Sequence, residues 1–389
     1  MFPNKNYESD IKYTIELNRF ICRLLGIWPS MNVKTLLTEN LRNTLLILIC
    51  YVLLCSELIP TVLYAIIIEK RTRNRLKHIS SIMFTTVAVF KYCNLVFSRN
   101  RVRNCLMRVQ EDWQNVASTN ARDSMLDSVK ISRHLIILCG IFMYTAGLYF
   151  RIVVPLSRGK SVTDQNITIR YLPCPTYYVF FDGRISPAYE IMFFMQFFSG
   201  LVKYTITVSI CSLAALFIMH VCAQLEILMM LMDNLVKEQE VKNLNKMLAL
   251  TVEYQIKTRS FLQLVQNTLE YTSLLELLGC TLMEWEDQNV ISMSSYLILL
   301  TSITFNIFIF CFIGEQLSIE GEKLSLTVCT LDWYHFPYDK ARALILIVAM
   351  SNKPIKFQAG KFVDLTIRTF GDVVKTSVAY MNLIRKVMD

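Results

Sequence analysis

Residues 189–232 read YEIMFFMQFFSGLVKYTITVSICSLAALFIMHVCAQLEILMMLM, and this stretch decides the fold. Its 44 residues would form an α-helix about 66 Å long, which is more than twice the roughly 30 Å thickness of a membrane's hydrocarbon core. Two crossings would require a polar turn, but the stretch offers only Gly200 and Lys203 and contains no proline. We therefore predict one long helix that crosses the bilayer and projects from it by several turns.

Six further apolar runs have about the length that a membrane helix needs. They cover residues 44–68, 79–97, 135–154, 261–283, 291–313 and 362–384. The composition agrees, because 53% of the residues are hydrophobic and 18% are charged, whereas soluble proteins carry about 25% charged residues. The sequence thus predicts an all-α membrane protein with seven transmembrane helices. A shorter apolar run, 341–350, cannot span a bilayer and is expected to form a helix that packs against protein.

The distribution of basic residues predicts the orientation in the membrane. Residues 1–19 are polar, so the first apolar run is interpreted as an anchor and not as a signal peptide. With the N-terminus inside, 23 Lys and Arg residues fall in inner segments and 11 in outer ones, although the first outer loop, 70–77, is itself basic. Positive residues favour the cytoplasm, and the sequon at Asn166 then lies in an extracellular loop, where it is a candidate glycosylation site. We expect a cytoplasmic N-terminus and an extracellular C-terminus.

Motifs for catalysis, metal binding or nucleic-acid binding are absent. The four histidines are far apart, the twelve cysteines form no CxxC pair, and no nucleophile or phosphate-binding motif occurs. His220 is predicted to be a hydrogen-bonded core residue. We expect no enzymatic activity, no cofactor and no nucleic-acid partner. Coupling to a G protein is not expected either, because no Asp-Arg-Tyr follows the third run and no Asn-Pro-x-x-Tyr lies in the seventh.

The last run, 362–384, carries four charges at spacings of 4, 4 and 3 residues, which would place them on one helix face. They are Asp364, Arg368, Asp372 and Lys375. A charge inside a membrane costs about 2.5 to 3.5 kcal/mol, so these side chains are not expected to face lipid. Two compatible interpretations remain: the ion pairs Asp364–Arg368 and Asp372–Lys375, or the wall of an aqueous path.

Beyond these charges the same face becomes apolar through Ala379, Leu383 and Val387. Apolar constrictions can gate a pore by dewetting. Leu and Val are also the ordinary residues of any membrane helix, so packing is the alternative interpretation.

The outer halves of the predicted spans are rich in methionine and aromatic residues, which suit a small apolar ligand. Ordinary helix packing is the alternative for each of them. Gly147 is expected to leave room for the ligand, whereas Tyr144 and Gln196 are expected to supply a polar contact. The candidate ligand contacts are Met83, Phe84, Val87, Tyr144, Gly147, Leu148, Met192, Phe193, Gln196 and Tyr296.

Short motifs, most of them in the C-terminal third, carry a family resemblance. They are Gly26-Ile27-Trp28-Pro29, the stretch 310–317 (FCFIGEQL), Trp333-Tyr334, Ser351-Asn352-Lys353-Pro354, Ala359-Gly360-Lys361-Phe362, Phe370, Lys375-Thr376-Ser377 and Tyr380. On these residues the chain resembles the insect odorant receptors, a family of ligand-gated cation channels with an inverted seven-helix topology.

The resemblance implies four subunits around a central pore that the last helix lines, with Leu383 and Val387 at its outer constriction. Inner helix extensions would form a cytoplasmic anchor, and each subunit would hold an odorant pocket in its outer half. The implied partners are a small volatile ligand, membrane lipid and a coreceptor subunit, in the plasma membrane of a sensory-neuron dendrite. The coreceptor carries a long insertion between the fourth and fifth spans, whereas only residues 233–257 connect them here. The chain therefore resembles an odorant-tuned subunit.

The resemblance predicts three regions along the chain. A cytoplasmic segment with an amphipathic helix covers 1–43, helices one to five with the pocket cover 44–283, and the last two helices with the anchor and pore cover 284–389. A gustatory receptor channel of the same fold is the nearest alternative, although its usual Thr-Tyr and Gln-Phe ending is replaced here by Ala379-Tyr380 and Ile384-Arg385. A membrane transporter is a further alternative, because intramembrane charges also mark ion relays, but the two halves show no internal repeat.

Overall fold

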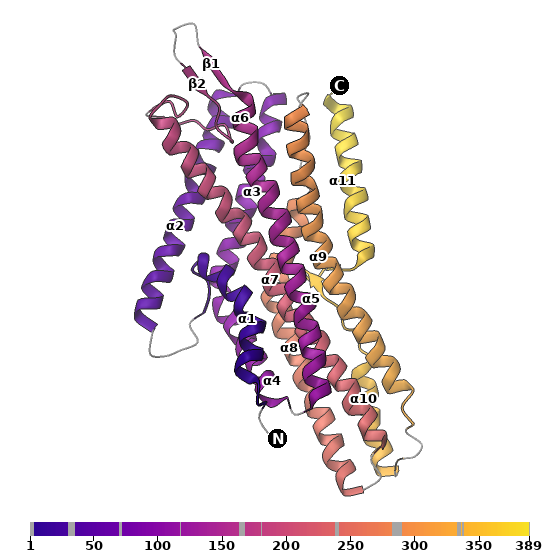
Figure 1. Ribbon diagram of the computed structural model, residues 1–389. Helices are drawn as coiled ribbons and strands as arrows, with labels where there is room; N and C mark the ends of the chain where they lie inside the picture. Colours follow the sequence, from indigo (N-terminus) through magenta and orange to yellow (C-terminus); the bar gives the residue numbers. More distant parts are fainter. Residues whose placement is uncertain are drawn as a thin grey trace.

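The computed structural model describes residues 4–29, 36–69, 72–116, 118–162, 168–179, 181–237, 241–281, 290–332, 336 and 338–388. They form an elongated bundle of long helices (Figure 1). The elements in chain order are α1 (Tyr7–Leu24), α2 (Leu36–Leu63), the π-helical turn η2 (Tyr64–Ile68), α3 (Thr72–Phe97), α4 (Arg99–Asn115), α5 (Thr119–Leu148), the π-helical turn η3 (Tyr149–Val153), α6 (Val154–Arg158), β1 (Lys160–Val162), β2 (Thr168–Arg170), α7 (Ala188–Lys237), α8 (Val241–Thr281), α9 (Val290–Cys329), α10 (Tyr338–Ser351), β3 (Gln358–Ala359), β4 (Val363–Asp364) and α11 (Ile367–Met388).

The two ends of the bundle differ. One end, at the top of Figure 1, carries the antiparallel hairpin β1–β2 and the last turns of α11, and we call it the β1–β2 end. The opposite end carries α10 and the first turns of α8, and we call it the α10 end. The chain therefore starts and finishes at different heights along the bundle, and the C-terminal helix finishes at the β1–β2 end (Figure 1).

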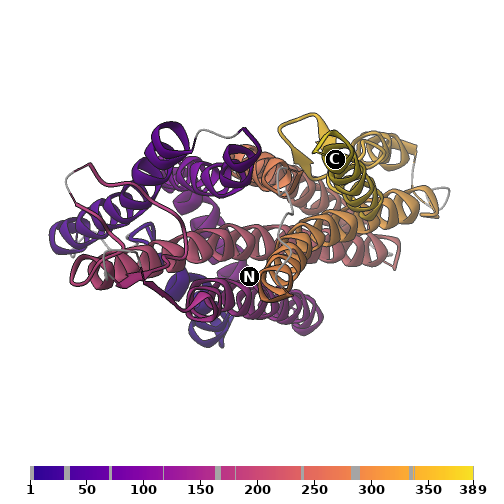
Figure 2. The same cartoon turned by 90° about the horizontal axis from the view of Figure 1, so that it is seen from above.

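The quoted stretch forms a single helix, as predicted. α7 contains 50 residues, and its most apolar membrane-length window is completely buried within the chain. Seen from above, it runs through the middle of the bundle (Figure 2), in contact with α5, α9, α8 and α2. Because it has no proline and no sustained polar face, it can be surrounded by other helices on all sides.

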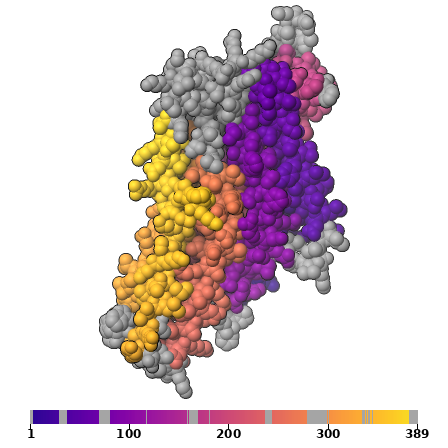
Figure 3. All heavy atoms as spheres, turned by 180° about the vertical axis from the view of Figure 1, so that it is seen from behind, coloured from indigo at the N-terminus to yellow at the C-terminus, as the bar shows by residue number. Residues whose placement is uncertain are grey.

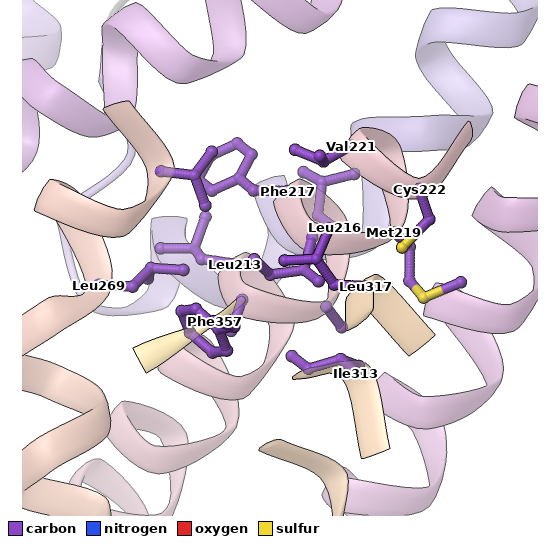
Figure 4. Packing of buried hydrophobic residues seen from close by; sticks show 14 of the residues in the cluster. Leu213, Leu216, Phe217, Met219, Val221, Cys222, Leu269, Ile313, Leu317 and Phe357 are labelled. Carbon is purple, nitrogen blue, oxygen red and sulfur yellow. The ribbon is translucent and has the colours of Figure 1, made fainter. Parts of the chain in front are cut away.

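The centre of the hydrophobic core lies where α7 meets α8, α9 and the hairpin β3–β4. Figure 4 shows Leu213, Phe217 and other α7 side chains packed against Leu269 of α8 and Phe357 before β3. Phe217 and Leu317 are completely buried. Each buried side chain of this size contributes roughly 1.5 to 3 kcal/mol, so this layer joins the N-terminal and C-terminal halves of the chain.

Each predicted span corresponds to a helix, although the last one, 362–384, begins in the hairpin β3–β4, and not all of these helices are equally apolar. Among the described residues, four helical segments are long and apolar enough to cross a membrane: Thr38–Ile68, Thr119–Ser157, Ala188–Leu235 and Leu300–Cys329. A fifth is the pair Ser81–Phe97 and Arg99–Asn115, which bends by 60°. α8 and α11 correspond to the fifth and seventh predicted spans but carry more charged residues. The predicted non-spanning helix at 341–350 is confirmed as α10.

The N-terminal segment is fixed by the motif that begins at Gly26. Gly26 has a positive φ of 69°, which a residue with a side chain rarely adopts, and the following Ile27 and Trp28 are buried. The Tyr92 hydroxyl of α3 donates to the Leu25 carbonyl over 2.8 Å. Asp10 of α1 accepts two hydrogen bonds from the Arg122 guanidinium of α5, so α1 is held on the α10 half of the bundle.

The last predicted span begins later than expected, and one predicted ion pair is wrong. Residues 358–364 form the hairpin β3–β4, and α11 starts only at Ile367. Asp364 is therefore a strand residue that binds the Lys356 ammonium and the Gln358 amide, and not Arg368. The hydrogen bond from Lys356 holds the pKa of Asp364 below its ordinary value. The sequence spacing failed here because Gly360 and Lys361, both with positive φ, close a turn that interrupts the helical register.

The expectation that Gly147 leaves room for a ligand is also wrong in this structure. The ring of Tyr204 on α7 lies directly against the Gly147 backbone, and any Cβ at this position would clash with it. The Tyr204 hydroxyl donates to the Gly147 carbonyl over 3.5 Å. Gly147 therefore allows α5 and α7 to approach closely, and the space beside it is filled by protein.

This contact generates a prediction with a control on the same helix. Gly147→Ala should lower the thermal unfolding temperature of the purified protein, because its methyl group must displace the Tyr204 ring, and overpacking costs about 1 to 3 kcal/mol. Gly140→Ala should leave this temperature unchanged or raise it, because nothing lies within 4 Å of a Cβ there and alanine is the better helix former. Equal unfolding temperatures for the two variants would contradict the packing described here.

Candidate functional site

A small cavity lies where α3, α5, α7, α8 and α9 meet. Its volume is about 10 Å³, which is room for roughly one water molecule. On α5, α7, α8 and α9, the lining residues lie in the half of the helix nearer the β1–β2 end. The cavity is lined by Phe84, Val87, Lys91, Met143, Thr207, Glu276, Ile303 and Asn306.

One wall of this cavity is a buried ion pair between two helices. The Lys91 ammonium on α3 lies 2.7 Å from Oε1 of Glu276 on α8, and the two side chains are only 6% and 5% exposed. Oε2 of Glu276 accepts a hydrogen bond of 2.7 Å from the Asn306 amide on α9, and the Cys139 thiol donates to Oδ1 of Asn306. Four helices, α3, α5, α8 and α9, thus meet at a polar group that is neutral overall.

A second group of buried charges lies closer to the β1–β2 end. Glu57 of α2 accepts hydrogen bonds through Oε1 from Arg151 of η3 over 2.7 Å and from Lys203 of α7 over 2.8 Å. Lys203 also donates to the Thr85 hydroxyl of α3. The three charged side chains are only 2–3% exposed. Two cations and one carboxylate give this group a net charge of +1.

The two groups of charges are adjacent through one aromatic ring. The Lys203 ammonium lies 5.7 Å from the ring centroid of Phe84, and Phe84 also lines the cavity. A cation over the face of a phenyl ring is attracted by its π-electrons. The Glu57 group therefore holds a wall of the cavity in place without lining it.

The amide of Gln196 is hydrogen-bonded to the chain before α7. It accepts from the Cys174 N–H and donates to the Cys174 carbonyl, both over 3.0 Å. Gln196 therefore fixes the loop between β2 and α7 to the first turns of α7. Tyr144 is likewise engaged, because its hydroxyl lies 2.7 Å from the Thr205 hydroxyl.

The predicted contact residues divide into two sets. Phe84 and Val87 line the cavity, whereas Met83, Tyr144, Leu148, Met192 and Phe193 are half-buried elsewhere in the bundle. The side chain of Tyr296 and the sequon residue Asn166 lie outside the described residues. The lining residues that the sequence reasoning missed are Lys91, Met143, Thr207, Glu276, Ile303 and Asn306. Two of them could have been found from the sequence, because Lys91 and Glu276 are charged residues inside predicted spans.

A larger and more open cavity of about 440 Å³ lies at the α10 end, between α4, the start of α5, α7 and α8. Its lining combines apolar side chains such as Leu231 with charged ones such as Arg108 and Asp112. His220 lies beside it, with Nε2 3.0 Å from Oδ2 of Asp112, which confirms the predicted hydrogen-bonded core histidine. None of the predicted contact residues that the structure describes lines this cavity, whereas Phe84 and Val87 line the smaller one, so the smaller cavity is the candidate ligand site.

The charged face of α11 is exposed. Arg368, Asp372, Lys375 and Ala379 face away from the bundle, whereas Phe370 packs edge-to-face on Phe308 of α9 with ring centroids 5.5 Å apart. Among the described side chains, Asp372 and Lys375 make no ion pair with each other. Leu383 and Val387 fall in the last turns of α11, where the side chains lie outside the described part of the structure.

Comparisons with known proteins agree with this architecture. The family profile described as 7tm Odorant receptor matches residues 73–378. Odorant receptor 82a of Drosophila melanogaster is 24% identical over 289 residues, which is 72% of each chain. Odorant receptor Or1 of Anopheles gambiae is 26% identical over 124 residues, which is 31% of this chain and 26% of that protein.

A solved structure supports the fold independently of these sequence matches. The insect olfactory receptor OR5 from Machilis hrabei, determined in complex with eugenol, superposes with a TM-score of 0.77 over 98% of this chain and 100% of that one. At 15% identity this likeness establishes the fold. The relatives are odorant receptors and not enzymes, in agreement with the sequence reasoning. The profile covers more than three quarters of the chain, and the chain therefore belongs to the 7tm odorant receptor family.

Proposed function

We propose that the chain is the odorant-binding subunit of a ligand-gated, non-selective cation channel and that the ligand binds in the cavity between α3 and α9. The observation that carries the proposal is the composition of the cavity wall, in which the apolar side chains of Phe84, Val87, Met143 and Ile303 stand beside the polar ones of Lys91, Thr207, Glu276 and Asn306. Small-molecule sites are typically enclosed and mostly apolar, with few polar groups. The Machilis hrabei receptor was solved with eugenol, a small oxygenated aromatic molecule, and a ligand of that kind suits such a wall.

Family membership favours an odorant over the alternatives of a gustatory channel and a transporter. An odorant-tuned role, and not that of the coreceptor, is supported by the short connection between α7, which ends at Lys237, and α8, which begins at Val241. The coreceptor would then be the partner subunit in a tetramer.

The pore in this proposal is lined by α11. This helix lies at one side of the bundle, with the hairpin beside it (Figure 2), and the same yellow segments follow one edge of the molecule in Figure 3. Its exposed charges would meet water in a pore. Exposed apolar side chains on α11 and on neighbouring elements would be covered by other subunits, since such patches mark protein contacts. These are Leu326, Ile345, Leu346, Phe362 and Val378.

A short hydrogen-bonded route connects the cavity to the proposed pore. Glu276 of the cavity wall lies on α8, and the same helix binds the hairpin that leads into α11. The Gln266 amide donates to the Gln358 carbonyl over 2.8 Å, and the Gly360 N–H donates to the Glu270 carbonyl over 3.2 Å. A ligand that moves α8 would therefore move the start of α11 through these bonds.

In this proposal the chain spans the plasma membrane of a sensory neuron with its N-terminus in the cytoplasm. The α10 end would then form the cytoplasmic anchor and the β1–β2 end would face outward. Asn166, in the loop between β1 and β2, would be extracellular and open to glycosylation.

The first test records current from cells that express the chain with an insect coreceptor, during exposure to volatile compounds. Odorant-evoked cation current is expected, and Met143→Ala should shift the relative responses toward larger odorants because it enlarges the cavity. Ile141→Ala is the control, because Ile141 is on the same helix but 55% exposed. Absence of current to every compound, at normal surface expression with the coreceptor, would contradict the proposed function.

The second test concerns the gate. Leu383→Ser and Val387→Ser should each raise the resting current or alter the ion selectivity, because a polar side chain eases the wetting of an apolar constriction. Unaltered currents in both variants, with normal amounts at the cell surface, would show that these residues only pack.

The third test concerns orientation. An epitope placed after Asp389 should be labelled by antibody on intact cells, and one placed before Met1 should be labelled only after permeabilisation. The reverse pattern would overturn the proposed orientation.

A further inference from the structure

The Lys91–Glu276 pair is unusual because it is a pair of buried charges that borders free space. Both side chains are at most 6% exposed, and both line the cavity. Burying two charges is costly, and an apolar pair of similar volume is often at least as stable. Ionisable residues within membrane helices are therefore expected to serve a function.

The polar side of the cavity has hydrogen-bonding capacity to offer a ligand. An ammonium group has three donors, and among the described residues Lys91 has one partner, Glu276. The Thr207 hydroxyl and the Asn306 amide line the same cavity from α7 and α9. An acceptor placed here would face donors from three helices.

We infer that Lys91, held by Glu276, binds the oxygen of a neutral oxygenated odorant such as an alcohol, a phenol, a ketone or an ester. Phe84, Val87, Met143 and Ile303 then contact its hydrocarbon part. This inference rests on the proposed function and adds the side chain that binds the polar atom of the ligand.

The charge balance of the cavity selects against ionised ligands. Lys91 and Glu276 already neutralise each other, so a carboxylate or an alkylammonium would introduce an uncompensated charge into a water-poor site, which is strongly unfavourable. A pure hydrocarbon is disfavoured for the opposite reason. It would cover the donors of Lys91 without replacing their hydrogen bonds, and buried donors without partners are costly.

The size of the cavity indicates how such a ligand is accommodated. The space of about 10 Å³ fits one oxygen atom with its hydrogen, as it would fit one water. The hydrocarbon part needs more room, which must come from side-chain movement. Met143 is suited to this, because methionine has three flexible bonds and adapts to irregular shapes.

The experiment compares receptors by the chemical class of odorant that activates them. Cells expressing the chain with a coreceptor are exposed to hydrocarbons, alcohols, ketones, esters, carboxylic acids and amines matched in carbon number. Half-maximal concentrations of the neutral oxygenated compounds should be lower than those of the matched hydrocarbons by roughly tenfold, because a hydrogen bond to a charged group is involved. Preference for hydrocarbons, acids or amines would overturn the inference and leave the proposed function intact.

The variant that tests the pair is Lys91→Met with Glu276→Gln, which removes both charges together and leaves neither unpaired. It should abolish the roughly tenfold preference for oxygenated compounds while retaining responses to hydrocarbons. Lys130→Met with Asp127→Asn removes an exposed pair of similar length on α5 and should change nothing.

Thr207→Val provides a variant that keeps the shape of the side chain and every buried charge. It should raise the half-maximal concentration of oxygenated odorants but not that of the matched hydrocarbons. If the double variant does not reach the cell surface, this variant tests whether the polar side of the cavity binds the oxygen. Unchanged class preference in Thr207→Val and in any double variant that reaches the surface would overturn the inference.

Discussion

The complete burial of the middle of α7, residues 203–225, is the constraint on which the rest of the structure depends. A helix that faces neither lipid nor water must find partners within the protein for each of its polar side chains. Lys203 finds Glu57 of α2 near the β1–β2 end, and His220 finds Asp112 of α4 near the α10 end. These contacts determine where the surrounding helices dock, so the polar residues of α7 position the bundle as much as its apolar ones do.

The two groups of buried charges in the upper half of the bundle have different surroundings. The Glu57 group joins α2, α3, η3 and α7 and lies behind Phe84, without lining the cavity. The Lys91–Glu276 pair joins α3 to α8 and forms part of the cavity wall. α8 also holds the hairpin that leads into α11. The same helix therefore contacts both the proposed ligand and the base of the proposed pore, which is the arrangement that a ligand-gated channel requires.

Local patterns in the sequence predicted the helices. The features that these patterns could not predict depend on contacts between residues that are far apart in the sequence. The 44-residue apolar stretch without proline was sufficient for α7, and a run too short to span was sufficient for α10. The predicted start of the last helix was wrong because Asp364 belongs to a hairpin closed by two residues with positive φ. Phe84 and Val87, which composition and depth singled out as ligand contacts, line the cavity between the helices, and their contact with a ligand stays a prediction. Gly147 was misjudged because Tyr204, 57 residues away in the chain, fills the space that a glycine leaves.

The central claim is that the ligand occupies the space between α3, α5, α7, α8 and α9, and the most direct measurement is a cryo-electron microscopy structure. The complex of this chain with its coreceptor, prepared with and without an activating odorant, would show where the ligand lies. The account predicts ligand density in contact with Phe84, Val87 and Met143, with its oxygen toward Lys91 and the Met143 side chain displaced. Ligand density in the open cavity at the α10 end, with the Lys91–Glu276 cavity unchanged, would contradict it.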